Sequence, residues 1–249
     1  MKIFVHGVPD TSKLWTPLLE ELQFSSKDFR TLSLPGFGCS RPEDFASTMD
    51  CYANWLLEQI QIISHENKTP LDLVGHDWGA ILSTRAASLR PDLIRSLAIG
   101  GATIDASYRG HLFAWLWSTP ILGHIVMTAF TPSQLQNTLE KQGMQKSLAA
   151  IEASALDKEM KSSILSLYRS AMGLRSLGKW EENLSNLPEK LMLIWGENDP
   201  YVSLSFAEKF TETWGGKLHV EANMGHWAMA TCAKSVGTIL KKFWGENPR

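Results

Sequence analysis

Short, almost wholly apolar runs alternate with stretches of helical periodicity along most of this chain. Six of these runs have the character of strands, at residues 2–7, 30–36, 70–76, 94–101, 190–196 and 216–222. Most of them lack the polar–apolar alternation of a strand with one solvent face, which favours strands buried on both faces of a parallel sheet. Helical spacing of apolar residues marks 12–22, 47–63, about 77–89 and about 233–244. This alternation predicts a three-layer α/β sandwich.

The alternation is interrupted between residues 103 and 186, which contain no convincing strand. This stretch has the pattern of several helices, at about 107–117, 120–129, 132–142 and 157–174, and Thr131-Pro132 is a good helix start. An all-helical insertion between two strands is most simply a cap over the carboxyl edge of the sheet, where open α/β sheets bind ligands. We therefore expect a core formed by 1–102 and 187–249, with 103–186 inserted as a helical cap.

Overall composition does not favour several classes of partner. The 249 residues carry a net charge of −2, so neither nucleic acid nor an anionic membrane is an expected partner. Three cysteines without CxxC spacing indicate reduced thiols in the cytoplasm rather than a disulfide framework or a zinc site. The N-terminus lacks the apolar core of a signal peptide. The most apolar window, 112–130, is interrupted by Pro120 and His124, which predicts pocket-lining helices without membrane insertion. A role at a membrane surface is the less favoured alternative for this window.

The segment 74-VGHDWGA-80 has the glycine spacing of G-x-S-x-G, the strand-to-helix turn that exposes a catalytic nucleophile. The middle residue of that motif is normally serine, but here it is Asp77. An aspartate before a helix is also one of the best N-cap residues. The two flanking glycines favour the nucleophile, because they permit the sharp turn and the close packing of the helix.

Two further residues follow later strands in the order that a catalytic triad requires. Asp199 comes after the fifth expected strand, in 195-WGENDPYV-202, and His226 after the sixth, in 223-NMGHW-227. Alone, the first is typical of a turn, and the second of an ordinary loop histidine. The order nucleophile, acid, histidine is that of the triad on such sheets. We therefore predict Asp77, Asp199 and His226 as the catalytic residues.

The chain resembles the α/β-hydrolase superfamily from end to end, and in particular its aspartate-nucleophile branch of epoxide hydrolases and haloalkane dehalogenases. The matching stretches are 6-HGVPD-10, 34-LPGFGCS-40, 74-VGHDWGA-80, 195-WGENDP-200 and 225-GHW-227. Family members usually carry two strands before the first of these stretches. The resemblance therefore implies an α/β-hydrolase fold with about six parallel strands and the two N-terminal strands missing. The edge so exposed would need cover, for example from a second subunit in a homodimer.

An aspartate nucleophile suits displacement at saturated carbon, because it leaves an alkyl ester that water can hydrolyse. His226 would activate that water, with Asp199 orienting the imidazole. The backbone N–H groups of Val8 and Trp78 would stabilise the tetrahedral intermediate. No metal or organic cofactor is needed. The expected partners are a small lipophilic substrate and water.

The leaving group separates the two subclasses of the branch. An opening epoxide needs a proton donor, and the resemblance implies Tyr168, on an expected cap helix. A departing halide needs N–H donors: the Trp78 indole and a second group, for which Trp115 or Trp117 would have to replace the Asn that many dehalogenases carry at position 8, here Val8. We favour an epoxide hydrolase. A haloalkane dehalogenase is the alternative, and a non-catalytic binding protein the second.

The substrate pocket is expected to be apolar and aromatic, which favours a small lipophilic molecule. The residues predicted to bind substrate are Phe37, Trp115, Trp117 and Trp227.

Overall fold

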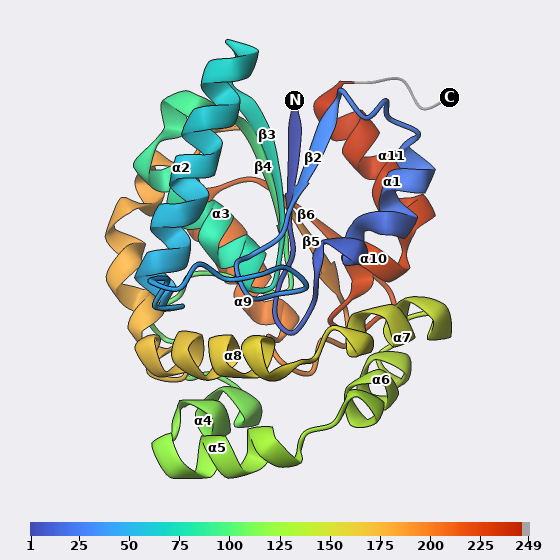
Figure 1. Ribbon diagram of the computed structural model, residues 1–249. Coiled ribbons are helices and arrows are strands. Elements are labelled where there is room, and N and C mark those ends of the chain that lie inside the picture. Colours follow the sequence, from blue (N-terminus) through green and yellow to red (C-terminus); the bar gives the residue numbers. More distant parts are fainter. Residues whose placement is uncertain (246–249) are drawn as a thin grey trace.

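A six-stranded parallel sheet forms the centre of the molecule in the computed structural model, which describes residues 1–245 (Figure 1). Its strands are β1 (Lys2–Val5), β2 (Phe29–Leu32), β3 (Leu71–His76), β4 (Ile94–Gly100), β5 (Leu191–Gly196) and β6 (Lys217–Glu221). They lie in the order β2-β1-β3-β4-β5-β6, and every neighbouring pair is parallel. The predicted sheet of six parallel strands is confirmed. A second copy covering the β2 edge stays a prediction.

Helices cover both faces of the sheet. Figure 1 shows α2 (Met49–Asn67) and α3 (Trp78–Leu89) on one side, and α1 (Thr16–Leu22) and α11 (Ala233–Trp244) on the other. The remaining core elements are the 3-10 helices η1 (Ser12–Trp15) and η2 (Pro91–Leu93), and the helices α9 (Leu204–Trp214) and α10 (Ala228–Thr231). The arrangement is the predicted three-layer α/β sandwich.

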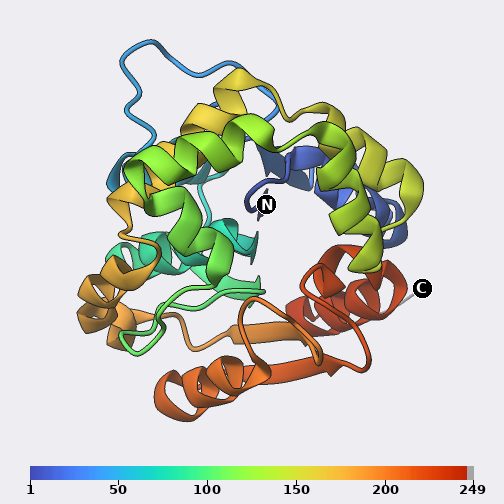
Figure 2. The same cartoon turned by 90° about the horizontal axis from the view of Figure 1, so that it is seen from below.

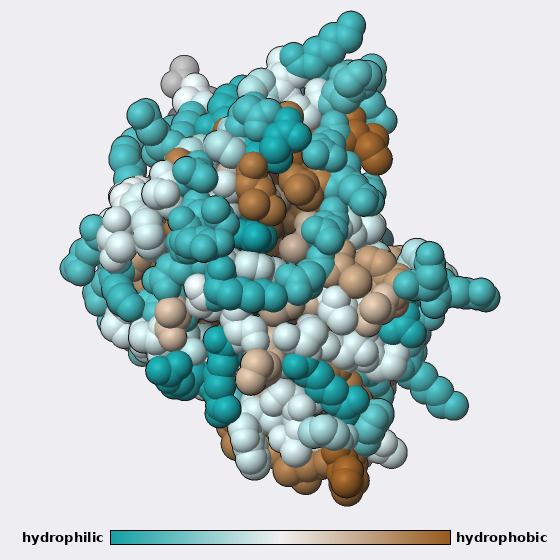
Figure 3. All heavy atoms as spheres, turned by 90° about the vertical axis from the view of Figure 1, so that its left-hand side faces the viewer, coloured by the Kyte–Doolittle hydropathy of each residue, from teal (hydrophilic) through white to brown (hydrophobic). Residues whose placement is uncertain are grey.

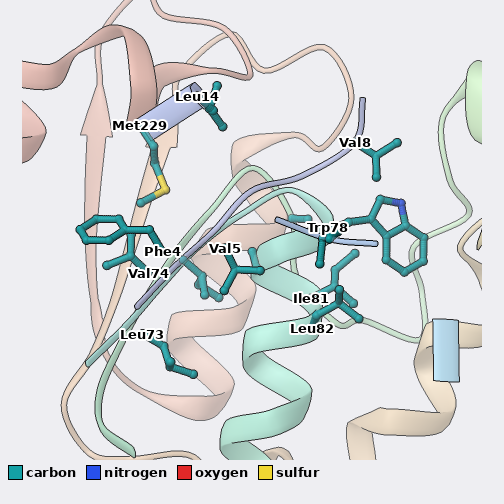
Figure 4. Packing of buried hydrophobic residues seen from close by; sticks show 14 of the residues in the cluster. Phe4, Val5, Val8, Leu14, Leu73, Val74, Trp78, Ile81, Leu82 and Met229 are labelled. Atoms are coloured by element: carbon teal, nitrogen blue, oxygen red, sulfur yellow. The ribbon is translucent and has the colours of Figure 1, made fainter. Parts of the chain in front are cut away.

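Strands β1, β3 and β5 are buried along their whole length, which explains their mostly apolar sequences. Successive residues of a strand point to opposite faces. Phe4 packs against Trp15 of η1, with ring centroids 5.4 Å apart. Val5 faces the other way, towards Ile81 and Leu82 of α3 (Figure 4). The apolar runs therefore encode two cores, one on each face of the sheet.

The regular elements between β4 and β5 are all helices. They form α4 (Leu112–Ser118), α5 (Pro120–Ala129), α6 (Pro132–Lys141), α7 (Lys146–Ser154), α8 (Lys158–Ser170) and the 3-10 helix η3 (Arg175–Asn186). Figures 1 and 2 show α4–α8 lying across the carboxyl ends of the strands. The segment η3 lies instead along α3, where Arg85 donates a 2.7 Å hydrogen bond to Asn183 and stacks on Trp180. The end of the inserted segment thus packs beside the sheet rather than over its edge.

Some helix boundaries differ from the sequence patterns. The helix expected at 107–117 begins only at Leu112, because Gly110 has a φ of +80°. The helix expected at 157–174 ends at Ser170. Thr131 caps α6 as expected. Its hydroxyl accepts the backbone N–H of Gln134, and the side-chain oxygen of Gln134 accepts the backbone N–H of Thr131. Helices α7 and α9 were not anticipated.

No single helix within residues 1–245 is long and apolar enough to cross a membrane. Helices α4 and α5 reach that length and composition only together, and the chain bends by 113° between them.

Candidate active site

Asp77 occupies a strained turn between β3 and α3. Its φ of 52° and ψ of −123° lie outside the regions that non-glycine residues favour. The flanking glycines make the turn possible. A Cβ on Gly75 would lie 2.5 Å from the carbonyl oxygen of Gly79, and a Cβ on Gly79 would lie 2.1 Å from that of Val5. The spacing of the motif is therefore dictated by close approach of backbone to backbone.

The Asp77 side chain points away from its helix. It makes no capping bond to α3, so the alternative interpretation as an N-cap is wrong. Its Oδ1 accepts the Val8 N–H at 2.8 Å, and its Oδ2 lies 3.5 Å from Nε2 of His226. One carboxylate oxygen is thus held by a backbone donor, and the other faces the imidazole.

His226 is joined to Asp199 on its other side. Nδ1 of His226 and Oδ2 of Asp199 are 2.8 Å apart. Oδ1 of Asp199 accepts the N–H groups of Tyr201 and Val202 at 2.8 and 3.0 Å. Asp199 therefore fills both roles considered for it, because one oxygen orders the turn after β5 and the other orients the imidazole.

Electrostatics favour a charged cluster of these three groups. Burial lowers the pKa of His226, but the charges of Asp199 and Asp77 and their hydrogen bonds outweigh it and raise the pKa to about 10. Burial raises the pKa of Asp77, yet hydrogen bonding to His226 and the charge of His226 bring it below its usual value. At neutral pH an imidazolium thus lies between two carboxylates.

The loop that carries His226 is held in place by hydrogen bonds at two positions. Nε2 of His76 is 3.0 Å from the backbone oxygen of His226. The indole N–H of Trp227 is shared between the two carboxylate oxygens of Asp10, at 3.0 and 3.1 Å. Asp10 and His76 therefore position the imidazole through its neighbours.

A cavity of about 50 Å³ opens in front of Asp77. Its lining is mostly apolar and comes from both core and cap: Val8, Pro9, Asp77, His111, Phe113, Trp117, Phe130, Leu135, Thr138, Tyr168, Tyr201, His226 and Trp227. The predicted residues Val8, Trp117, Tyr168 and Trp227 are among them. The structure thus brings cap and core residues together around the carboxylate.

Two residues predicted to bind substrate do not line this cavity. Phe37 is fully buried and packs against His6 and Tyr52, at centroid distances of 6.1 and 6.0 Å. Trp115 points outwards from α4, whereas Trp117 of the same helix points inwards. Aromatic character alone could not distinguish these positions, because the direction of a side chain depends on how its helix lies on the core.

Tyr168 of α8 is buried beside Trp78 and Trp117, with ring centroids at 5.6 and 5.0 Å. Burial raises its pKa well above that of a free phenol, and the charge of Asp77 raises it further. The phenol therefore keeps its proton. The indole nitrogen of Trp78 is buried, and its interaction with the Tyr168 phenol lowers the pKa of the phenol against the larger effect of burial. Trp78 is not part of the cavity lining.

The sequence interpretation missed two polar residues of the cavity. Nδ1 of His111 accepts the Ala114 N–H at 3.2 Å at the start of α4, so the proton of the neutral ring is on Nε2. Burial lowers the pKa of His111 to about 4, which keeps the ring neutral. Tyr201 follows Asp199 by two residues, and burial raises its pKa to about 12. Correct placement of the start of α4 would have identified His111 as its cap.

The chain is similar to several known hydrolases. It is 22% identical to epoxide hydrolase 3 of Xenopus tropicalis over 99% of this chain and 72% of that protein. It is 28% identical to the (E)-2-((N-methylformamido)methylene)succinate hydrolase of Acinetobacter baylyi, over 39% of this chain and only 35% of that enzyme. The haloalkane dehalogenase DbeA of Bradyrhizobium elkani has the same fold, with a TM-score of 0.77, 20% identity and coverage of 98% of this chain and 89% of that one.

A family model also matches nearly the whole chain. It is described as the alpha/beta hydrolase fold, and it covers residues 3–231, from the first strand to the helix that follows His226. The sheet, the turn at Asp77 and the loops after β5 and β6 all lie within the matched region. The chain therefore belongs to the α/β-hydrolase fold family.

Proposed function

We propose that this protein hydrolyses a small lipophilic epoxide to a diol through an alkyl ester on Asp77. The observation that carries the proposal is that one cavity is lined by both a nucleophile and a proton donor. Asp77 is an ionised carboxylate, and Tyr168 is a phenol that keeps its proton, and both line the same mostly apolar space. Such a pair can attack a saturated carbon and protonate the oxygen that leaves it. Similarity to epoxide hydrolase 3 supports the same class.

In the first half-reaction Oδ2 of Asp77 bonds to one carbon of the epoxide, and the bond from that carbon to the ring oxygen breaks. The ring oxygen takes the proton of Tyr168. The resting imidazolium of His226 then supplies a proton through the cavity to restore the phenol. This transfer leaves His226 neutral. The imidazolium that supplied a proton during alkylation thereby becomes the neutral base that hydrolysis requires.

In the second half-reaction water attacks Cγ of Asp77, and its proton passes to His226. The negative charge develops on Oδ1, which already accepts the Val8 N–H at 2.8 Å. The backbone N–H of Trp78 is the second donor to the developing oxyanion, and its hydrogen bond already lowers the pKa of the Asp77 carboxyl. Collapse of the intermediate releases the diol and returns Asp77 and His226 to their charged forms.

A haloalkane dehalogenase is the second candidate, because Trp117 offers an indole in the cavity lining. Halide departure would also use the Trp78 indole, which is buried outside that lining. Val8 provides no side-chain donor. The cavity therefore suits an alkoxide, which needs a proton, better than a halide, which needs N–H groups.

The variant His226→Gln tests the covalent route. Loss of the base should spare alkylation and block hydrolysis, so the peptide containing Asp77 should gain the mass of an epoxide. Intact-protein and peptide mass spectrometry would follow incubation with aryl and alkyl epoxides and, separately, haloalkanes. Wild-type turnover without any adduct in the variant would mean that water attacks the substrate directly. No turnover of any substrate would favour a binding protein.

The variant Tyr168→Phe tests the leaving group. It removes the proton donor and keeps the ring that packs on Trp78 and Trp117, so the melting temperature should not change. Epoxide opening should slow by roughly 10²–10⁴-fold, the usual range for general acid catalysis. Free halide release from a haloalkane should be unaffected. Full epoxide turnover in the variant would rule out the phenol as the acid.

A further inference from the structure

The outer faces of α4 and α5 carry a cluster of exposed apolar side chains. We call it the α4–α5 face; it consists of Leu112, Trp115, Ile121, Leu122 and Ile125. Leu112 is 66% exposed, Trp115 49% and Ile121 77%. Figure 3 shows hydrophobic atoms gathered at the lower end of the molecule, where Figure 1 places these helices. A contiguous apolar surface of this kind marks an interaction site more often than chance exposure does.

The two helices of this face carry no acidic residue, and the acidic residues at the start of the neighbouring α8 accept backbone N–H groups: Asp157 accepts that of Met160 and Glu159 that of Arg41. Residues 106–139 contain no aspartate or glutamate. Arg169 of α8 donates to the Pro120 carbonyl at 2.8 Å, and Lys161 donates to the Phe130 carbonyl at 2.6 Å. Both cations are thus bound at the ends of α5 by backbone oxygens rather than by carboxylates, so their positive charge is not neutralised.

A basic hollow of about 410 Å³ adjoins the α4–α5 face. It lies between α5 and α8 and is lined by His124, Met127, Thr128, Lys158, Lys161, Ser162 and Leu165. Two lysines, a histidine and two hydroxyl residues provide donors for an anionic oxygen, and the lining includes no carboxylate. An apolar surface beside such a hollow matches an amphiphile with an anionic head.

The same helices connect this face to the catalytic cavity. Phe113 and Trp117 of α4 line the cavity, while Leu112 and Trp115 point outwards. Phe130, at the end of α5, is a further cavity residue. Only one layer of helix therefore separates the outer apolar surface from the site.

We propose that the α4–α5 face binds the surface of an anionic lipid bilayer, with its apolar side chains at the acyl boundary and Lys158 and Lys161 at the headgroups. Apolar helices with flanking cations and an exposed tryptophan bind membranes in this way, without spanning them. A second copy of the chain fits less well, because a twofold contact would bring uncompensated cations together. Loading of a lipophilic substrate from the bilayer is a consequence that rests on the proposed function.

Flotation with vesicles tests this proposal without any enzymatic assay. The wild-type protein should bind vesicles that contain phosphatidylglycerol and should bind pure phosphatidylcholine on the order of tenfold more weakly. The double variant Trp115→Gln/Ile121→Gln should lose binding to both. Lys158→Gln/Lys161→Gln should lose the preference for anionic lipid. Ile62→Gln, a comparably exposed position on α2, should bind as the wild type does.

Two measurements keep the test decisive if a variant folds poorly. Brominated lipid should quench the tryptophan fluorescence of the wild type more strongly in anionic vesicles than in phosphatidylcholine vesicles, and added salt should reduce this difference. Analytical ultracentrifugation measures whether the protein is a monomer or a dimer, and so tests whether a second copy of the chain covers the α4–α5 face instead. A wild-type protein that ignores vesicles overturns the proposal. A dimer that the Trp115→Gln/Ile121→Gln variant dissociates, without lipid binding by the wild type, assigns the face to a second copy instead.

Discussion

At the scale of single residues, the central feature is one imidazole between two carboxylates. His226 owes its pKa of about 10 to the charges of Asp199 and Asp77 together, against the opposing effect of burial. On the proposed mechanism, alkylation converts Asp77 into a neutral ester and removes one of these two charges. The pKa of His226 must then fall, so the same residue is an acid before alkylation and a base after it.

This coupling predicts opposite pH responses for the two half-reactions. The pKa of Asp77 is lowered, so alkylation should persist as the pH falls towards 4. Hydrolysis of the ester needs neutral His226 and should slow as the pH falls. In wild-type enzyme, rapid quenching and mass spectrometry should therefore find the Asp77 adduct at about pH 5 and little of it at about pH 8. Greater accumulation at the higher pH would contradict this order of proton transfers.

His111 provides a second prediction at this scale. Its Nδ1 caps α4, and its neutral ring has Nε2–H available in the cavity. We expect this group to donate a hydrogen bond to the opening epoxide beside Tyr168. His111→Asn keeps a good N-cap and removes the ring donor. Alkylation should slow on the order of tenfold, with an unchanged melting temperature.

The control for this variant is His111→Ala, which removes both the cap and the donor. It should lose stability as well as rate, since an N-cap contributes about 1 kcal/mol. Wild-type alkylation by His111→Asn would restrict His111 to its capping role.

At the scale of elements, one buried carboxyl joins the cap to the core. Glu152 of α7 is fully buried and accepts the Thr11 N–H at 2.6 Å and the Thr11 hydroxyl at 3.2 Å. Burial and the nearby Asp10 charge raise its pKa to about 8, against the opposing effect of the Thr11 hydrogen bonds. We therefore expect the connection between α7 and the loop after β1 to weaken as the pH rises towards this value.

Glu152→Gln should remove that sensitivity. Because the folded pKa is raised above the unfolded value of about 4.5, the contribution of Glu152 to stability is present below pH 4.5 and is lost as the pH rises towards 8. Urea unfolding at about pH 5.5 and about pH 8.5 should show the wild type losing stability relative to the variant at the higher pH. An equal difference at both values would mean that Glu152 does not titrate in this range.

Elements differ in how well their sequences predict them. The inner strands β1, β3 and β5 were found because a strand buried on both faces needs a mostly apolar run. Helix α9 was missed although Leu204, Ala207, Phe210 and Trp214 recur at helical spacing on the side that packs against the core. The 3-10 conformation of η3 depends on packing against α3, through contacts such as Arg85 with Asn183. No local pattern encodes such a contact.

At the scale of the whole molecule, the sequence predicts which loops meet but not which way every side chain points. Asp77, Asp199 and His226 follow β3, β5 and β6, and parallel strands end at one common edge of the sheet. Their juxtaposition could therefore be inferred from order alone. The directions of Phe37 and Trp115 could not, because they depend on the placement of a loop and of a cap helix in three dimensions.

The cap leaves the core after β4 and rejoins it at β5, which are neighbours in the sheet. Asp77, Asp199 and His226 all lie outside this insertion, whereas Tyr168 and His111 lie within it. On the proposed mechanism, the groups that protonate the leaving oxygen thus lie on a different segment of the chain from those that hydrolyse the ester. Evolution can exchange one such segment for another between two fixed ends. A lineage can then turn from one class of electrophile to another while its ester-cleaving apparatus stays as it was.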